Sequence, residues 1–472
     1  ILYMGLRAAL RIIVCTLNNF YCIPVHFCWI FVLQPLKWFA TSTYWVVEGI
    51  MFRWLLSMVA LWSYSTGYHV VELGDDVWDL IFERTLVLFN HQSTSDVPLI
   101  MAAFNSRKGL SNNIMWIMDH VFKFTNFGIV SWVHGDFFIH GGKDHRDASL
   151  IQLGNHLHEF YMPRDRKWLV LFPEGGFLKN RKAGSQRYAK KNNLPLLENV
   201  ALPRVGALKV IMDNAAADSH DDGTDRIKYL LDVTVAYPGG RPLDLQTIFG
   251  GWRPGCDTIF HYRRFNIEEV LYQGQTVTAL PLVLVMSVSF GVQACVIVGT
   301  LISCHASTIV STALQILNFF QNCLTVRIWA RVEDGPWVAE NGSGVADGSR
   351  VDLYTNLKFL DRINYFICFE YKFSIFYFQI PKEEEELKKW LYTRYEEKEA
   401  ILQEYYDTGT FPDVHTSHAP DFQPENVRRL SGARVVHDPL EFILRHCFFI
   451  SSTYIWISIL YWVYQTIFQL LW

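Results

Sequence analysis

Apolar side chains gather in long uncharged runs near both ends of the chain. Between Arg11 and Lys37 lies a stretch without Asp, Glu, Lys or Arg. It is about as long as the roughly 20 residues that cross a bilayer, although Pro24 is expected to kink a helix there. A shorter uncharged run, 54–71, ends in aromatic residues and predicts a second span or a re-entrant segment. The uncharged run 447–472 predicts a C-terminal anchor.

These runs divide the chain into membrane segments at 1–70, a central domain, and a transmembrane anchor at 441–472. A secretory signal peptide is the competing interpretation of the first run, but no small-residue cleavage site clearly follows it. Arg7, Arg11 and Arg445 flank the outer spans, and they lie on one side if the second run returns the chain. The positive-inside rule then predicts a domain that faces the cytosol. Because the chain begins at Ile1, we expect that an initiating segment precedes it.

Residues 71–270 change to short apolar runs separated by amphipathic stretches, which predicts an α/β domain. The expected strands are 85–89, 128–133, 168–172, 200–205, 232–237 and 258–265. Farther along, 381–406 shows a helical stripe of large apolar residues and predicts an amphipathic helix. We interpret 381–440 as the C-terminal part of the same domain.

The segment 271–380 differs from both of its neighbours. Residues 270–326 contain no Asp, Glu, Lys or Arg, and a polar, Gly-rich patch follows. The uncharged run is long enough for two spans, which predicts an inserted membrane hairpin. The alternative is an unspliced segment, bounded by the codon of Val270 and by the tract that encodes the residues before Ile380. The second interpretation is favoured, and transcript lengths distinguish the two.

Composition narrows the class of protein. Half of the 472 residues are hydrophobic and the formal net charge is −4, which excludes a disordered chain and gives no indication of nucleic-acid binding. The nine cysteines are scattered, without the spacing of zinc ligands or of a disulfide framework. We therefore expect a reducing environment and no metal site.

Candidate chemistry begins where the predicted strand 85–89 ends in Asn-His-Gln-Ser-Thr-Ser-Asp. His91 and Asp96 form an H-x4-D pair at this strand end. A neutral imidazole removes a hydroxyl proton well near pH 7, and a carboxylate on its other nitrogen holds the tautomer. The alternative is structural, with His91 bonded to backbone and Asp96 capping a helix. The pair His220 and Asp225 has the same spacing in a polar loop, and we regard it as chance.

A second constellation follows the strand 168–172, which runs into Pro-Glu-Gly-Gly. Such a turn lets backbone approach a ligand closely, so Glu174 is expected to contact a hydroxyl or an amine; a tight surface turn is the alternative. Basic residues come next and are expected to bind CoA phosphates, an anionic headgroup or the membrane surface, if they are not simply a solvated helix face. The substrate-binding candidates are Phe172, Pro173, Glu174, Gly175, Gly176, Lys179 and Arg181.

In order along the chain, NHQSTSD, GDFFI, FPEGG and ALPR resemble the four motif blocks of the glycerophosphate and lysophospholipid acyltransferase (PlsC-type) family. Longer strings, including RDRKWLVLFPEGGFLKNR and EEKEAILQEYYDTGTFP, are similar to the branch acting on lysophosphatidylglycerol or lysophosphatidylethanolamine. The resemblance covers most of 1–270 and 381–472, but not 271–380.

The resemblance implies a PlsC-like α/β domain with terminal transmembrane helices, in a multi-pass protein of the endoplasmic reticulum membrane. It implies His91 as general base, Asp96 as its partner, and 172–175 as the acceptor-binding block. Acyl-CoA is then the donor substrate, a lysophospholipid is the acceptor, and no cofactor stays bound.

Two positions depart from the family pattern. His140 stands where the second block commonly has Arg, and Gly176 stands where the third has Ser or Thr. Arg146 or Lys143 are candidates to substitute, although Lys does not reproduce a planar bidentate contact. Both departures put the binding of the acceptor phosphate in doubt more than the acyl transfer.

Two rival functions remain open. A hydrolase or a CoA-independent transacylase would use the same His–Asp pair, and dependence on acyl-CoA distinguishes them. A non-catalytic membrane scaffold would bind anionic lipid through its basic patch, and His91→Ala would leave its phenotype intact.

Overall fold

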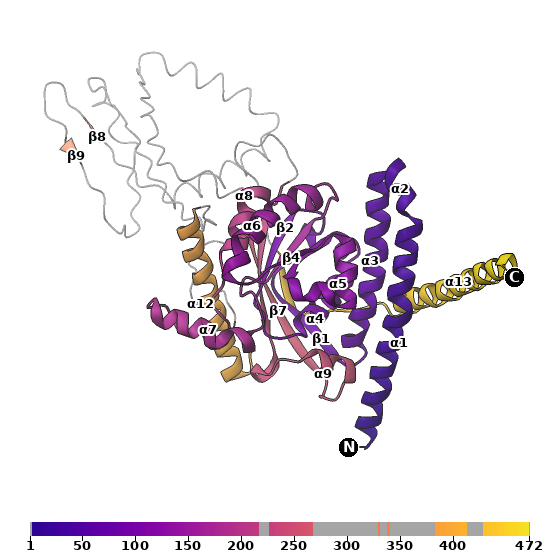
Figure 1. Cartoon of the computed structure of the whole chain (residues 1–472). Coiled ribbons are helices and arrows are strands. Elements are labelled where there is room, and N and C mark those ends of the chain that lie inside the picture. Colours follow the sequence, from indigo (N-terminus) through magenta and orange to yellow (C-terminus); the bar gives the residue numbers. More distant parts are fainter. Residues whose placement is uncertain are drawn as a thin grey trace, which may run out of the picture. The chain divides into compact units, whose positions relative to one another are not determined.

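The computed structural model describes residues 2–216, 226–267, 329–330, 338–339, 383–412 and 428–471. One compact unit takes in the described residues of Ile1–Tyr272 and Phe378–Trp472 (Figure 1). In the second unit, β8 (Trp329–Ala330) pairs antiparallel with β9 (Val338–Ala339). Apart from these four residues, the predicted insert 271–380 lies outside the described residues, as does the pair His220 and Asp225.

A mixed sheet of eight strands forms the centre of the first unit, in the order β10-β1-β7-β6-β2-β5-β3-β4. The strands are β1 (Tyr68–Asp75), β2 (Thr85–Phe89), β3 (Ile114–Asp119), β4 (Phe137–Ile139), β5 (Trp168–Leu171), β6 (Tyr229–Ala236), β7 (Cys256–Asn266) and β10 (Arg429–Arg434). Strands β6, β2, β5, β3 and β4 run parallel. Their carboxyl ends therefore meet at one edge, where ligands of open α/β sheets bind.

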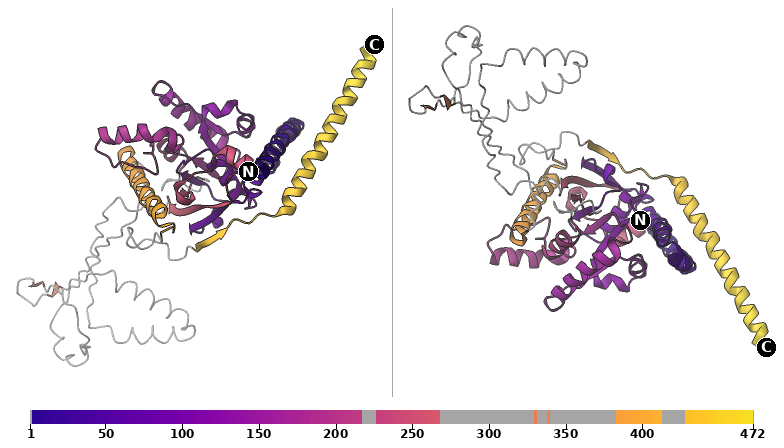
Figure 2. Two further views of the ribbon diagram at one scale, coloured as in Figure 1. Left: turned by 90° about the horizontal axis from the view of Figure 1, so that it is seen from below. Right: turned by 90° about the horizontal axis from the view of Figure 1, so that it is seen from above.

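Helices cover both faces of the sheet. One core joins the sheet to α1 (Leu2–Val32), α3 (Thr41–Tyr64), α4 (Asp96–Asn105), α5 (Asn126–His134) and α9 (Leu245–Gly250). The other joins it to α6 (Lys143–His156), α7 (Leu178–Lys191), α8 (Gly206–Ala215) and α12 (Glu384–Thr408). Both views of Figure 2 show α12 and α1 on opposite sides of the sheet. Residues in β2 and β5 are accordingly buried throughout, as expected of parallel strands covered on both faces.

Three of the described helices are long and apolar enough to cross a membrane: α1, α3 and α13 (Pro439–Leu471). Helix α1 continues through Pro24 as a single helix. Helix α13 confirms the expected C-terminal helix, and it projects beyond the sheet domain in Figure 2. These observations agree with an α/β domain that carries terminal membrane helices.

The second apolar run differs from its prediction. Helix α3 begins at Thr41 and ends at Tyr64, while 68–71 belong to strand β1. The hydroxyl of Thr66 donates to carbonyls of the last turn, and Gly67 takes a φ of +82°, so the chain leaves the helix before β1. The helix also extends farther toward the N-terminus than the uncharged run, and it includes the charged residues Glu48 and Arg53. Both side chains are buried in contacts with the domain.

Two predicted strands are wrong. Residues 128–133 lie in α5, where Thr125 caps the first turn by accepting from the N–H of Gly128, and Gly135 closes the helix in the left-handed conformation. Residues 200–205 form no strand in the described structure, because the N–H groups of Val200, Ala201 and Leu202 are bonded to side chains instead.

The predicted amphipathic helix is α12, and its apolar stripe is buried against the sheet. Strand β10 then adds antiparallel to β1 at the edge of the sheet. The segment after the insert therefore completes the same sheet domain.

Candidate functional site

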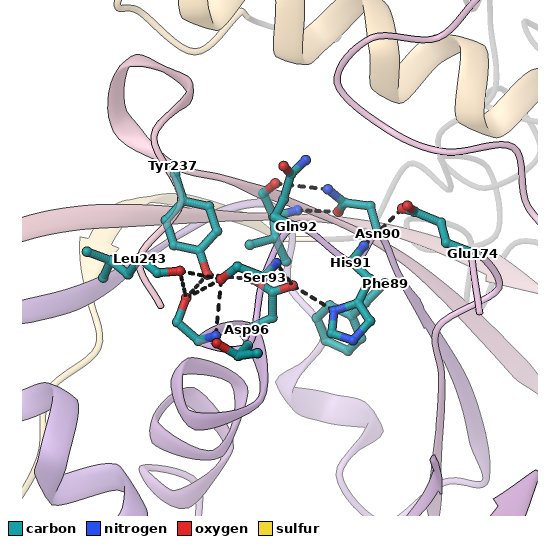
Figure 3. Close-up of polar contacts among 12 residues, drawn as sticks. Phe89, Asn90, His91, Gln92, Ser93, Asp96, Glu174, Tyr237 and Leu243 are labelled. Atoms are coloured by element: carbon teal, nitrogen blue, oxygen red, sulfur yellow. Dashed lines mark hydrogen bonds and ion pairs between the residues drawn. The ribbon is translucent and has the colours of Figure 1, made fainter. Parts of the chain in front are cut away.

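His91 lies two residues beyond the end of β2, at the edge where the parallel strands end. Its Nδ1 is 2.8 Å from Oδ2 of Asp96, the first residue of α4. Only six residues, 90–95, separate the strand from the helix, so the two side chains of the H-x4-D motif meet (Figure 3). With Nδ1 engaged by the carboxylate, the neutral imidazole carries its free lone pair on Nε2.

Asp96 is fully buried, and three groups bond to its carboxylate. Besides His91, Oδ2 accepts the N–H of Ser93 at 3.0 Å, and Oδ1 accepts the hydroxyl of Tyr237 at 2.5 Å. The hydroxyl of Ser95 lies 2.8 Å from that of Tyr237. Burial, and secondarily the charge of Asp96, raises the pKa of Tyr237, so its phenol stays protonated as a donor. Sequence reasoning missed Tyr237, which is 141 positions away from Asp96.

The imidazole of His91 is held between two aromatic rings. Phe172 stacks on it with ring centroids 4.1 Å apart, and Phe177 lies at 4.4 Å. The carbonyl of His91 accepts the N–H of Leu178 at 2.7 Å, which ties the loop to the start of α7. Among the described residues, none bonds to Nε2 of His91, so this nitrogen is available to a substrate hydroxyl.

Glu174 was expected to contact substrate, but its carboxyl group bonds to backbone instead. Its side chain is fully buried, Oε1 accepts the N–H of His91 at 2.9 Å, and Oε2 accepts the N–H of Ala201 at 3.1 Å. Figure 3 shows Glu174 and Tyr237 on opposite sides of the His91 loop. Burial raises the pKa of Glu174 to about 8. The carboxyl group thus links two loops, and its proposed contact with substrate stays a prediction that this geometry does not favour.

Helix α12 bonds to the backbone on both sides of this link, before Ala201 and before His91. Oε2 of Glu399 accepts the N–H groups of Asn199 and Val200 at 2.8 and 3.2 Å, directly before the Ala201 that bonds to Glu174. On the same helix, the hydroxyl of Tyr395 donates to the carbonyl of Phe89 at 3.3 Å. Tyr395 therefore holds the backbone two residues before His91. Glu399 holds the backbone next to Ala201, which bonds to the same Glu174 side chain as His91.

Lys398 adds a buried charge to this support. Its side chain is fully buried, and its ammonium pairs with Asp232 of β6 at 2.8 Å and donates to the carbonyl of Val233. Arg263 of β7 pairs with the same carboxylate at 2.6 Å. Such a pair is costly to break because it leaves an uncompensated buried charge.

The glycine turn lies beside arginines. Gly175 has a φ of +68°, and a Cβ built on it would lie 3.4 Å from the guanidinium of Arg204. A Cβ on Gly176 would lie 3.2 Å from Arg181. Burial, and then the charges of Arg181 and Arg146, lowers the pKa of Arg204. The structure therefore brings Gly175, Gly176 and Arg181 together with two arginines, whereas Pro173 is buried and Lys179 is exposed.

His140, the departure in the second block, follows β4 at the same edge. Its ring centroid is 3.6 Å from that of His120, which follows β3. Arg146 lies instead near Gly206, with a guanidinium nitrogen 3.4 Å from the position of a Cβ there. Arg146 thus lies near the arginine cluster. The side chain of Lys143 lies outside the described structure. Within the described ranges, no three His, Cys, Asp or Glu residues are placed to hold a metal ion.

Comparison with known proteins adds to this geometry. The family model described as "Acyltransferase" matches residues 81–212, and "Acyltransferase C-terminus" matches 375–431. The first range contains His91, Asp96 and the glycine turn, and the second contains α12. Of the solved structures, the 1-acyl-sn-glycerophosphate acyltransferase PlsC from Thermotoga maritima matches with a TM-score of 0.28 and 14% identity, over 54% of this chain and 87% of that one.

Curated relatives are more similar. The human protein named acyl-CoA:lysophosphatidylglycerol acyltransferase 1 is 43% identical over 57% of this chain and 76% of its own length. Its mouse counterpart is 41% identical over 58% and 77%. Lysocardiolipin acyltransferase 1 of Danio rerio is 29% identical over 50% and 59%. The chain therefore belongs to the glycerophosphate and lysophospholipid acyltransferase family and is an acyl-transferring enzyme.

Proposed function

We propose that this protein transfers an acyl group from acyl-CoA to the free hydroxyl of a lysophospholipid, with lysophosphatidylglycerol or lysophosphatidylethanolamine as acceptor. The two relatives with the highest identity reported above are named for acyl-CoA and lysophosphatidylglycerol, which supports this substrate class. The single observation that carries the chemistry is the contact between His91 Nδ1 and Asp96 Oδ2, because it leaves Nε2 unprotonated in the neutral ring.

In the proposed mechanism, Nε2 of His91 removes the proton of the acceptor hydroxyl as that oxygen attacks the thioester carbonyl carbon. Asp96 stabilises the imidazolium that forms and holds its orientation. The carbon–sulfur bond then breaks, the new ester remains on the acceptor, and the CoA thiolate takes up the proton from Nε2. No acyl-enzyme intermediate is required.

Positive charge near the site suits the phosphates of both substrates. Arg181, Arg204 and Arg146 gather beside the glycine turn and are the candidates for phosphate recognition. They compensate in part for the missing Arg of the second block, where His140 stands. Phe172 and Phe177 exclude water from the flanks of the imidazole.

The basic helix α7 is better suited to CoA than to the membrane surface. Its one buried residue, Ala189, belongs to the core on the α12 face, whereas α1 and α3 pack on the opposite face. Lys182 forms an ion pair with Glu198 at 2.7 Å. The exposed cations that remain to meet the soluble, phosphate-rich part of CoA are Lys179, Arg187, Lys190 and Lys191.

We further propose that the protein is a multi-pass component of the endoplasmic reticulum membrane, with its sheet domain facing the cytosol, where acyl-CoA is found. The basic residues Arg7, Arg11 and Arg445 near the outer spans support this orientation.

The test uses the full chain in phospholipid nanodiscs with radiolabelled acyl-CoA and a panel of lysophospholipids that differ in headgroup. We expect acylation of at least one lysophospholipid and a loss of 10²-fold or more in rate for His91→Ala, as for removal of a general base. His158→Ala, at an exposed histidine on the α6 side, is the matched control. Transfer from phospholipid without acyl-CoA would identify a transacylase, and transfer unaffected by His91→Ala would contradict the mechanism.

A further inference from the structure

An unusually apolar surface is formed by the segment that connects β3 to β4. We define the aromatic hook as residues 121–132, which comprise most of η2 (His120–Phe124) and of α5. Val121 is 72% exposed, Phe124 77% and Trp132 59%, and Ile129 is also exposed. Contiguous exposed side chains of this kind mark an interaction surface on a folded domain.

The hook is continuous with the helices that are long enough to cross a membrane. Phe127 packs edge-to-face on Trp62 of α3 with ring centroids 5.8 Å apart, and α5 also contacts α1. Helix α1 exposes large apolar side chains along its length, including Leu10 and Phe20. A lipid phase that covers α1 therefore reaches the neighbouring α5.

The charged residue of the hook, Lys123, is placed as in membrane-interface segments. The ammonium of Lys123 lies 5.4 Å from the ring centroid of Trp132. Trp and Lys side chains of this kind keep an apolar body in the lipid and a polar end at the headgroups. This pairing favours a lipid surface over an apolar protein partner, which would leave the cation without water or phosphate.

The hook is also joined directly to the edge of the sheet where His91 lies. It follows Asp119, the last residue of β3, which is in register with Ile139 of β4. The ring of His120, at the base of the hook, lies 3.6 Å from that of His140. The same edge carries His91 after β2 and the glycine turn after β5.

We propose that the aromatic hook inserts into the bilayer interface, so that the lysophospholipid acceptor reaches His91 sideways from the membrane without passing through water. This proposal rests on the proposed function, since it assigns the route of that acceptor. The hook supplies the apolar contact with lipid tails, and the polar sheet edge receives the headgroup and its free hydroxyl.

The test compares two acceptors with the same headgroup in full-chain protein reconstituted in nanodiscs. One is a long-chain lysophospholipid that stays in the bilayer, and the other is a six-carbon analogue that dissolves as a monomer. For Val121→Ser/Phe124→Ser we expect the apparent KM of the long-chain acceptor to rise at least tenfold. The kcat and the KM of the soluble analogue stay within twofold, because both substituted side chains are exposed and outside the site.

Phe82→Ser is the matched control. Phe82 is 67% exposed but precedes the start of β2, at the opposite edge of the sheet from His91, and its substitution should leave both acceptors unaffected. Equal losses with both acceptors, or no loss with either, would overturn the proposal. Loss confined to native membranes, with normal kinetics in nanodiscs, would assign the hook to a protein partner and overturn it as well. If the unsubstituted protein acylates neither acceptor, it is the proposed function that fails.

Discussion

Glu174 bonds directly to His91: its Oε1 accepts the backbone N–H of the histidine at 2.9 Å. The acid of the glycine turn and the proposed base of the H-x4-D motif are thus parts of one buried unit. Because the other oxygen of Glu174 holds Ala201, a change in this carboxyl group moves two loops at once.

Glu174 also predicts a pH dependence of stability. Its folded-state pKa of about 8 lies above the ordinary value of 4.5, so the folded protein binds more protons between these two values. Stability from this group is complete below about pH 4.5 and is lost as the pH rises through about 8, with a slope of at most about 1.4 kcal/mol per pH unit. Glu174→Gln removes the titrating carboxyl group, so the apparent Tm should depend less on pH between 5.5 and 8. Identical slopes for the two proteins would contradict the prediction.

Removal of the Tyr237 hydroxyl tests whether the carboxylate of Asp96 needs the donor on its Oδ1. Tyr237→Phe deletes a bond to a buried charge, and such bonds contribute about 1.5–3 kcal/mol. We expect kcat to fall by about 10- to 100-fold with KM nearly unchanged, since the phenol meets Asp96 and Ser95 rather than substrate. Steady-state kinetics with acyl-CoA measure both constants. A change confined to KM would instead place Tyr237 in substrate binding.

Glu399 is expected to act as a positioning residue from a distance. Glu399→Ala removes the acceptor for two backbone N–H groups in the loop that Glu174 holds, so kcat should fall at least tenfold while both KM values change little. Glu399→Gln retains one carbonyl oxygen and should restore part of the rate. Glu396→Ala, at an exposed site on the same helix, is the control. A purely structural role would give losses that follow the apparent Tm and no recovery with Gln.

The contact of α3 with the domain predicts a large stability effect. Glu48 is fully buried between His134 and Arg166, at 2.7 and 2.8 Å, and Phe52 stacks on the same histidine. Glu48→Gln leaves the buried guanidinium of Arg166 without its carboxylate partner, so the free energy of unfolding should fall by about 3–5 kcal/mol. Glu83→Gln breaks a surface pair with Lys228 and should cost less than about 1 kcal/mol. Denaturant titration of each variant in detergent measures its free energy of unfolding and so compares the two.

The sequence predicted the parts of the site that are close along the chain. His91 and Asp96 are five residues apart across a strand end and a helix start, so local geometry alone brings them together. Tyr237 and Glu399 were missed because their contacts depend on how β6 and α12 pack, which no local pattern encodes. For Glu174, the motif identified the residue, but burial decided its bonding partners.

The fold shows the same division. Strands β2 and β5 were predicted closely because continuous apolar runs bounded by polar residues are typical of buried strands. Strand β7 was predicted as well, although it contains Arg263 and Arg264. Residues 128–133 were expected to be a strand on account of Ile129, Val130 and Val133. The start signal at Thr125 and the stop signal at Gly135 would have indicated the helix α5 instead.

The register of β1 with β10 has a consequence for how the enzyme is made. Val71 of the second strand from the edge pairs with Arg434, and α12 supports the His91 loop through Glu399. A chain emerging from the ribosome has therefore placed α1 and α3 and synthesised His91 long before either of these late elements exists. We therefore expect the site to gain its full set of supporting contacts only after α12 and β10 have been synthesised and have docked.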